Sequence, residues 1–407
     1  MKLIRGIVKG FFVVCTVLTV CVFGMLLFVD SNTATSYKVG KGEQFKLNSI
    51  LPVTSEVCSS DKQKEKYSVD LKLFGVIPYQ TVDVEVVDDT RVAVLGQPFG
   101  MRVYTEGVLV IDATDVTTKS GKQNPAKAAG IKIGDYIETV NGKRISTNEE
   151  LADLVEYSGG NRLKFKVLRD NSTFTTYVYP VKDKESGHYK IGIWVRDSSA
   201  GIGTLTFYSP STGVICGLGH GICDEDTDKL LTVYSGQMVS ADIMSVKKGK
   251  SGTPGELNGR FMGEILGKIS LNCESGVYGK AATNVFAADL TEIALKNDVK
   301  NGEAQILCTV DGQKPKLYSC EIKKNQKTVF GGEDNLTVTV TDGDLLEATG
   351  GIVQGMSGSP VLQNGRLIGA ITHVLVDDPT TGYAIFAENM LETAQSVANS
   401  EKLRDAS

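Results

Sequence analysis

The sequence has few of the features that mark nucleic-acid-binding proteins. Its 407 residues include 43 lysines and arginines against 48 acidic residues, which gives a net charge of −5. It contains no long basic run and no stretch in which aromatic and basic residues alternate. Recognition of nucleic acid depends on a concentrated positive surface. We therefore expect no nucleic-acid partner.

Long helical patterns are scarce as well. Val, Ile, Thr and Tyr recur in short runs separated by Gly, Asn and Asp, and glycine alone accounts for 44 residues. Short runs of this kind are typical of strands joined by turns. A chain of this length can hold two ordinary hydrophobic cores. We predict a mostly β protein with two folded units and an N-terminal tail.

One long apolar segment, residues 11–29, carries no charge over 19 positions, with three basic residues before it and Asp30 directly after it. Such a segment can span a bilayer, and its positive flank favours a cytoplasmic N-terminus. A cleaved signal peptide is the alternative, but its apolar region is usually shorter and ends at small residues. We expect residues 1–30 to be an uncleaved membrane anchor that leaves residues 31–407 outside the cytoplasm.

Cysteine is present, but never as a Cys-x-x-Cys pair. Six of the eight cysteines follow the apolar segment, where disulfides are permitted but not required. Cys308 and Cys320 flank a predicted hairpin and could face each other across it. Two separate buried thiols are the simpler interpretation.

Residues 31–70 are polar, lysine-rich and weakly patterned, which indicates a stalk. Alternation of apolar and polar residues begins at Ser68. It leads to QNPAKAAGIKIGDYIETVNGKRI, where Asn124 and Pro125 open a short helix that Gly130 ends. This passage resembles a PDZ domain of the bacterial protease type, a β-sandwich with two helices. We assign residues 71–184 to this domain and its preceding strands.

The PDZ resemblance implies a peptide-binding groove. Ser146 and Glu149 form a capping box for a helix that would make one wall. The other wall would be the strand after the glycine loop at residues 96–100, whose amides could receive a peptide carboxylate. For the loop alone, a plain turn is the alternative. The residues expected to bind peptide are Gly96, Phe99, Gly100 and Leu151.

The second unit, residues 185–407, contains GMSGSP at residues 355–360, similar to the GDSGGP pattern around the serine of chymotrypsin-like proteases. A nucleophilic serine needs a tight turn and two backbone amides directed at the developing negative charge. Ser357 is the candidate nucleophile, with the amides of Gly355 and Ser357 as the oxyanion hole. A type I′ hairpin at Asn364 follows. We predict a chymotrypsin-like double β-barrel, although a Gly/Ser-rich surface turn would share part of this pattern.

Only three histidines are available as a base. His188 lies in a charged link, and His373 lies in the strand after the serine. His220 lies in the glycine-rich segment GVICGLGHGICDEDTD, and we select it. With Cys216 and Cys223 it could instead suggest a zinc site, but no fourth ligand is evident. We expect no metal and no cofactor.

From residue 70 onward, the chain resembles the stage IV sporulation protein B peptidase family. The motifs that carry the resemblance are IGIWVRDSSAGIGTLTFY, GLGHGICD, SGTPGEL and the long segment around Ser357. The resemblance implies a membrane-tethered serine endopeptidase, secreted by the forespore into the space between the two membranes. It also implies cleavage of the regulatory subunit of an intramembrane metalloprotease, which activates the last mother-cell sigma factor. The PDZ domain would recognise partner proteins or peptide segments and assist self-cleavage.

Carried over to this sequence, the family's catalytic residues fall on Ser357, His220 and Asp342, in the chain order of chymotrypsin. Asp342 precedes the serine by only 15 residues, unlike chymotrypsin. Asp344 is an alternative third member, and either carboxylate could simply cap the turn at Leu345.

Two other functions fit parts of the same sequence. One is a PDZ-based binding protein with a catalytically silent barrel, which the presence of both His220 and Ser357 argues against. The other is a general envelope quality-control protease, which would share the domains but degrade unfolded chains broadly. Substrate profiling on folded and unfolded proteins would separate a signalling protease from this second alternative.

Overall fold

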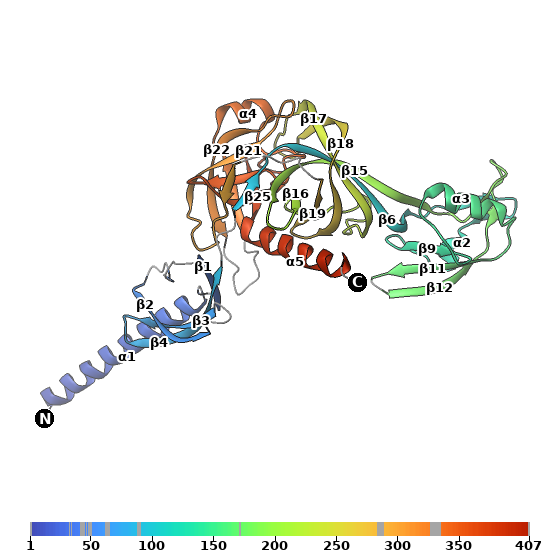
Figure 1. The fold of residues 1–407 in the computed structure, drawn as a ribbon. Helices are drawn as coiled ribbons and strands as arrows, with labels where there is room; N and C mark the ends of the chain where they lie inside the picture. Colours follow the sequence, from blue (N-terminus) through green and yellow to red (C-terminus); the bar gives the residue numbers. More distant parts are fainter. Residues whose placement is uncertain are drawn as a thin grey trace.

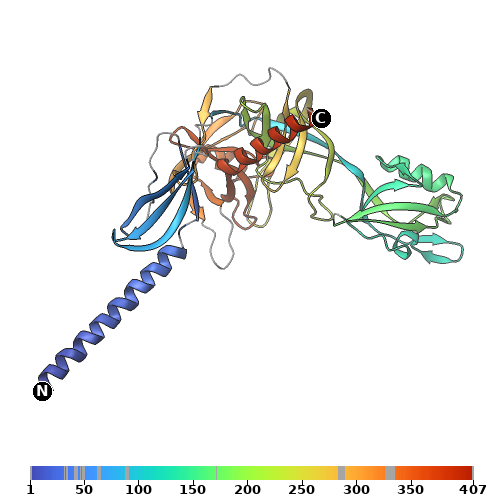
Figure 2. The ribbon, with the colours of Figure 1, turned by 60° about the horizontal axis from the view of Figure 1, so that its bottom comes forward.

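The structure is a computed structural model that describes residues 2–31, 33, 35–40, 45, 47, 51–61, 66–87, 91–170, 172–282, 289–325 and 335–405. Figure 1 shows a small sheet beside the N-terminal helix, a central pair of barrels, and a further β unit on the side away from that helix. Figure 2 shows the same order from another direction. The fold is mostly β, as predicted.

The N-terminal apolar segment lies within α1 (Lys2–Ser31). Among the residues described, no helix is both long enough and apolar enough to cross a membrane. The membrane anchor stays a prediction.

The predicted stalk is wrong, because most of its described residues form strands of a four-stranded sheet in the order β1-β4-β3-β2. Alternate side chains of β3 and β4, among them Leu71 and Val82, are fully buried on one face of the sheet. The sheet contacts the C-terminal helix through Lys38, which lies 3.6 Å from Glu388. The strands are β1 (Ser36–Gly40), β2 (Val53–Asp61), β3 (Lys66–Leu73) and β4 (Ile77–Val87).

The first barrel is a ring of six strands, β6-β17-β18-β19-β16-β15, closed by pairing between β6 and β15. Its interior is filled by apolar side chains that include Phe99, Leu205 and Ile215. Two short strands, β5 (Arg91–Val94) and β20 (Leu290–Glu292), extend the sheet beyond β15. The ring strands are β6 (Pro98–Asp112), β15 (Trp194–Ser209), β16 (Val214–Gly217), β17 (Val233–Lys247), β18 (Glu256–Cys273) and β19 (Gly276–Ala281).

The second barrel is closed in the order β21-β22-β23-β26-β25-β24. Asn364 and Gly365 both have positive φ, 52° and 76°, which confirms the predicted type I′ turn between β24 and β25. The last helix packs Met390 and Ala394 against residues of both barrels. The elements are β21 (Gly302–Cys308), β22 (Lys316–Asn325), β23 (Asn335–Val340), α4 (Gly343–Thr349), β24 (Pro360–Gln363), β25 (Arg366–Val374), β26 (Thr381–Phe386) and α5 (Ala387–Asp405).

The PDZ unit has its own core and two helices. Asn124 caps α2 as predicted, whereas α3 is capped by Thr147, one residue later than expected. The elements are β7 (Val116–Thr118), β8 (Gly121–Gln123), α2 (Pro125–Ala128), β9 (Tyr136–Val140), β10 (Lys143–Arg144), α3 (Asn148–Tyr157), β11 (Leu163–Arg169), β12 (Ser172–Val178), β13 (Val181–Lys182) and β14 (Tyr189–Lys190).

The PDZ unit is an insertion into the first barrel. Strands β6 and β15 both run from the barrel into the PDZ unit, and they pair with each other in both places (Figure 1). Residues 91–104 therefore belong with the barrel, although we had assigned them to a PDZ domain ending at residue 184. Strand β6 continues without interruption from the barrel into the PDZ unit, so no linker in the sequence marks this boundary.

Candidate active site

Ser357 lies in a turn shaped by two glycines with positive φ, Gly355 at 96° and Gly358 at 93°. Within this turn the Met356 amide donates to the Val353 carbonyl, and the Ser359 amide donates to the Met356 carbonyl. The Gly355 and Ser357 amides donate no hydrogen bond to any residue that the structure describes. Two such amides beside a hydroxyl are what an oxyanion hole requires.

The first barrel holds this turn in place. The Thr204 amide donates to the Ser357 carbonyl at 2.9 Å, and its hydroxyl donates to the Gly355 carbonyl at 2.9 Å. The Thr206 hydroxyl donates to the Gly358 carbonyl at 2.8 Å. A Cβ on Gly358 would collide with the Thr204 carbonyl oxygen, so glycine is required there. The serine therefore lies at the contact between the two barrels.

Thr204 and Thr206 were not among the predicted site residues. Both are almost completely buried on β15, where hydroxyls need hydrogen-bond partners. The signal in the sequence was a pair of hydroxyls at alternate positions of an otherwise apolar strand, TLTF. Because the acceptors lie about 150 residues later in the chain, the pattern alone could not identify them.

The Ser357 hydroxyl donates to the Thr372 carbonyl at 2.7 Å. Ser357 is only partly buried, whereas Ser359 is fully buried and its hydroxyl has no hydrogen-bond partner among the described residues. An approaching peptide could therefore reach Ser357 but not Ser359. This difference favours Ser357 as the nucleophile.

His220 follows β16 in a tight turn in which Leu218 and Gly219 have positive φ. Its Nδ1 lies 2.8 Å from the Gly221 carbonyl oxygen. A carbonyl can only accept, so Nδ1 carries the proton and Nε2 has the lone pair that a general base needs. Burial and the neighbouring His373 lower the pKa of His220, while the hydrogen bond to Gly221 raises it.

His373 lies beside His220, with ring centroids 4.5 Å apart. We had passed over His373 because it lies in the strand after the serine. That strand, β25, brings it to His220 and also supplies Thr372, which holds the Ser357 hydroxyl. Ser357 and His220 thus approach adjacent residues of one strand, although no hydrogen bond joins them in the part of the chain described. In unliganded enzymes such catalytic bonds often form only when substrate binds.

Asp342 does not contact His220. It is the N-cap of α4, where Oδ1 accepts from the Asp344 and Leu345 amides, each at 3.1 Å. Its Oδ2 accepts from the Ser319 amide at 3.1 Å. The predicted bond from His220 to Asp342 is therefore absent between these two described residues. Asp342 therefore acts as a helix cap, which was the alternative to a catalytic role. The Asp344 side chain is exposed.

Asn272, on β18, fixes the chain just after His220. Its Oδ1 accepts from the Ile222 amide at 2.8 Å, and its Nδ2 donates to the carbonyls of Ile222 and Leu231, both at 2.9 Å. We did not predict this residue. A single buried amide in a strand was its only signal in the sequence.

Cys216, considered with His220 and Cys223 as a zinc site, packs in a hydrophobic core and donates its thiol to the Phe207 carbonyl. Burial raises its pKa far above the ordinary range, which opposes the thiolate that a metal would bind. Within the described ranges, no three His, Cys, Asp or Glu side chains are grouped to hold a metal.

The predicted PDZ groove is wrong. Gly96 and Gly100 lie outside the PDZ unit. An added Cβ at Gly96 would strike Leu307 of the second barrel, and one at Gly100 would strike Phe261 of the first barrel. Phe99 is fully buried in the barrel core, and Leu151 is buried in the PDZ core. These glycines serve close packing and do not form a carboxylate-binding loop.

A different strand edge of the PDZ unit is open in the structure. The first residues of β15, Trp194–Arg196, pair with β6 on one side only among the described strands. Helix α3 lies beside this edge, and its Asn148 amide donates to Asp197 Oδ2 at 3.0 Å. Gly192, with φ of 80°, forms the turn before the strand. An open strand edge beside a helix can accept a peptide as an added strand. We had assigned this segment to the second domain.

Comparisons with known proteins agree with these two units. Residues 84–178 match the PDZ domain family. Two curated relatives are named as zinc metalloproteases. The one from Bartonella henselae is 32% identical over 83 residues, which cover 20% of this chain and 22% of that protein. The one from Lactococcus lactis is 29% identical over 202 residues, which cover 46% of each. The chain therefore spans less than half the length of either relative.

Two solved structures are also similar in part. A PDZ domain of an SdrC-like protein from Listeria monocytogenes has 22% identity and a TM-score of 0.19, covering 22% of this chain and 87% of that one. A thermostable serine protease from an extremophilic microorganism has 9% identity and a TM-score of 0.31. The match covers 49% of this chain and 92% of that one. Residues 187–391, just over half of the chain, match the SpoIVB peptidase S55 model. The chain belongs to the SpoIVB peptidase S55 family and is a serine peptidase.

Proposed function

We propose that this protein is an endopeptidase of the chymotrypsin-like double-barrel type in which Ser357 is the nucleophile and His220 is the base. The observation that carries this proposal is the Ser357 turn, with the Gly355 and Ser357 amides unbonded in the described chain. The first barrel fixes the turn at three hydrogen bonds. Such fixed donors act on the transition state without reorganisation.

In this mechanism, the Ser357 hydroxyl turns from the Thr372 carbonyl toward His220 Nε2, which takes its proton as Oγ attacks the scissile carbonyl. The Gly355 and Ser357 amides donate to the resulting oxyanion. His220 then passes the proton to the leaving amine as the peptide C–N bond breaks. A water molecule, deprotonated by His220, then attacks the acyl group, and the Ser357–acyl bond breaks to release the second product. Throughout, the His220 Nδ1–H stays on the Gly221 carbonyl, which orients the ring as a carboxylate does in a triad. Asp342 has no direct part in this scheme.

We infer the biological setting from the resemblance to the family. The substrate would be the regulatory subunit of an intramembrane metalloprotease, and its cleavage would activate the late mother-cell sigma factor, with self-cleavage of the protease. The PDZ unit would engage partner or internal segments at the open edge of β15. The uncharged segment at residues 11–29 supports an anchor in the forespore membrane, with the barrels in the intermembrane space.

The test is serine labelling with a fluorophosphonate, which reacts only with an activated serine, together with turnover of a labelled casein. Ser357→Ala should fold normally, lose labelling and lose turnover by roughly a million-fold, as in other serine proteases. Ser359→Ala is the matched control and should keep both. If Ser359→Ala is inactive while Ser357→Ala is active, the nucleophile is misassigned. A folded wild-type chain that neither labels nor cleaves would indicate a silent binding protein.

A further inference from the structure

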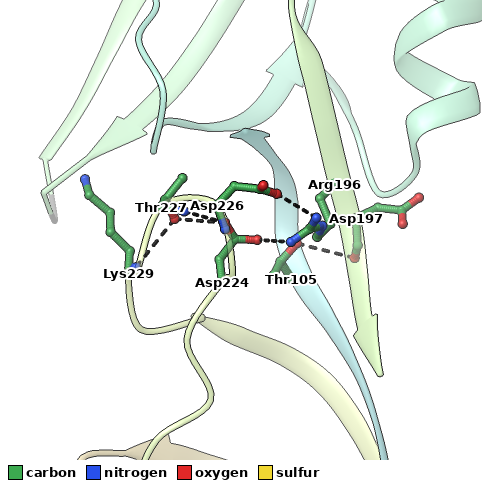
Figure 3. Close-up of polar contacts among 7 residues, drawn as sticks. All are labelled: Thr105, Arg196, Asp197, Asp224, Asp226, Thr227 and Lys229. Atoms are coloured by element: carbon green, nitrogen blue, oxygen red, sulfur yellow. Dashed lines mark hydrogen bonds and ion pairs between the residues drawn. The ribbon is translucent and has the colours of Figure 1, made fainter. Parts of the chain in front are cut away.

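The loop that follows His220 is attached to the PDZ unit by an arginine. Figure 3 shows Arg196, on β15, directed at Asp224 and Asp226 of this loop. Arg196 Nη1 lies 2.6 Å from Asp224 Oδ2, and Nη2 lies 2.7 Å from Asp226 Oδ2. Arg196 belongs to the PDZ end of β15, the segment with the open edge. Asp224 is only four residues beyond His220.

Asp224 is a buried carboxylate that organises its own loop. Its side chain is 0% exposed. Its Oδ1 accepts from the Asp226 amide at 3.2 Å and from the Thr227 amide and hydroxyl, each at 3.0 Å (Figure 3). Its Oδ2 accepts from Arg196. A buried carboxylate without a cation is strongly unfavourable, so Arg196 stabilises this loop against the PDZ strand.

Other contacts of the same loop lead to the PDZ unit. Leu231 packs with Leu109 and Tyr136, both of the PDZ sheet. Lys229 Nζ lies 3.2 Å from Asp170 Oδ1, in the β11–β12 turn. On the barrel side, Asn272 holds Ile222. The chain between His220 and Asp224 is therefore fixed from the barrel at one point and from the PDZ strand at the next.

The strands themselves are tied at the place where they leave the barrel. The Thr105 hydroxyl, on β6, donates to the Gly107 carbonyl at 2.8 Å. The same hydroxyl oxygen lies 3.4 Å from the Asp197 carbonyl oxygen on β15, a longer and weaker contact (Figure 3). Asp197 is next to Arg196 and receives the first amide of α3. The position of Arg196 is thus set by the PDZ unit and by the barrel together.

We propose that Arg196 is a positioning residue for catalysis: through Asp224 and Asp226 it holds the loop whose Gly221 carbonyl orients His220. This inference rests on the proposed role of His220 as the base. Arg196 touches neither His220 nor Ser357. Its effect reaches the site through four residues of chain, and a small displacement of a catalytic group costs about a hundred-fold in rate.

The experiment uses the full-length chain in a mild detergent and measures the rate of Ser357 labelling by a fluorophosphonate between pH 5 and 9. This reagent is too small to contact the PDZ unit, so its binding constant should not change. Arg196→Ala should lower the maximal labelling rate by about a hundred-fold. Loosening the loop should also expose His220, so the acid limb of the pH profile should move to higher pH. A merely structural role would not move that limb.

Arg196→Ala leaves Asp224 buried and unpaired, so it could unfold. Asp224→Asn removes that charge, and the double variant Arg196→Ala/Asp224→Asn leaves no buried unpaired charge. Asp224→Asn and the double variant should show the same loss of labelling rate and the same pH shift as Arg196→Ala. The labelling rate of the double variant should be no lower than that of either single variant, because the two residues act as one pair. Arg196→Lys, which keeps the charge but not the two-pronged geometry, should recover part of the rate.

Arg169→Ala is the matched control. Arg169 lies 2.6 Å from Asp135 in the PDZ unit, and the two side chains are 28% and 1% exposed, close to the 30% and 0% of Arg196 and Asp224. The Arg169→Ala variant should be less stable than the wild type, but the pH profile of Ser357 labelling should not change. Folded Asp224→Asn or double variants with wild-type rate and profile would overturn the inference, as would an equal shift in Arg169→Ala. If His220→Ala labels at the wild-type rate, the proposed base is wrong and the inference falls with it.

Discussion

Asp342 uses both carboxylate oxygens to accept backbone amides, so the structure predicts a small catalytic effect at this position. Asp342→Asn should change kcat by less than about tenfold, whereas a triad aspartate would lose about ten-thousand-fold. Asparagine caps a helix as well as aspartate does, but its amide group would face the Ser319 N–H. We expect a stability loss of about 1 kcal/mol, measured by denaturant unfolding beside kcat. A large loss of kcat at unchanged stability would restore Asp342 to the catalytic machinery.

His373 affects the protonation of His220, since its ring lies against the base and lowers the pKa of His220. His220 must be neutral to accept a proton, so activity falls as the pH drops through its pKa. Replacing His373 by Ala removes a neighbouring charge and some burial, and both changes raise the pKa of His220. The acid limb of kcat/KM against pH should therefore move to higher pH. A shift in the opposite direction, or none, would contradict this reasoning.

At the scale of single residues, the sequence singled out the candidates that act through their own side chains, the glycine-flanked Ser357 and His220 in its glycine-rich turn. It did not reveal the groups that these two side chains contact, because both groups are backbone carbonyls, of Thr372 and Gly221. Any residue type can supply a carbonyl, so no sequence pattern marks it.

Among the elements, those defined by local interactions were predicted best. The Asn364 hairpin and the Asn124 cap depend on residues a few positions apart. The loop at residues 96–100 failed because glycine serves two purposes that look alike in sequence. It permits positive φ in a turn, and it permits close packing, which is its role at Gly100 beneath Phe261.

For the whole molecule, the mostly β character followed from the sequence, but the arrangement of the units did not. The N-terminal sheet was missed because only β1 and β2 lie wholly in the weakly patterned segment, whereas β4 alternates and was assigned to the PDZ domain with its preceding strands. Strand β1 joins β4 from a distant part of the chain. The insertion of the PDZ unit was missed because it is a property of strand pairing. Pairing between residues 98–104 and 198–204 spans about a hundred residues and leaves no local signal.

Because Tyr104 and Ser198 are paired neighbours on antiparallel strands, the PDZ unit is a removable module. Replacing residues 105–197 by an Asn-Gly turn should join β6 to β15 as an ordinary hairpin and leave the barrel closed. The shortened protein should melt cooperatively and still label at Ser357, at the reduced rate expected without Arg196. A fragment of residues 185–407, the second domain predicted from the sequence, would lack β6 of the barrel and should not fold. Circular dichroism melting of both forms would distinguish them, and a shortened protein without a melting transition would contradict the insertion.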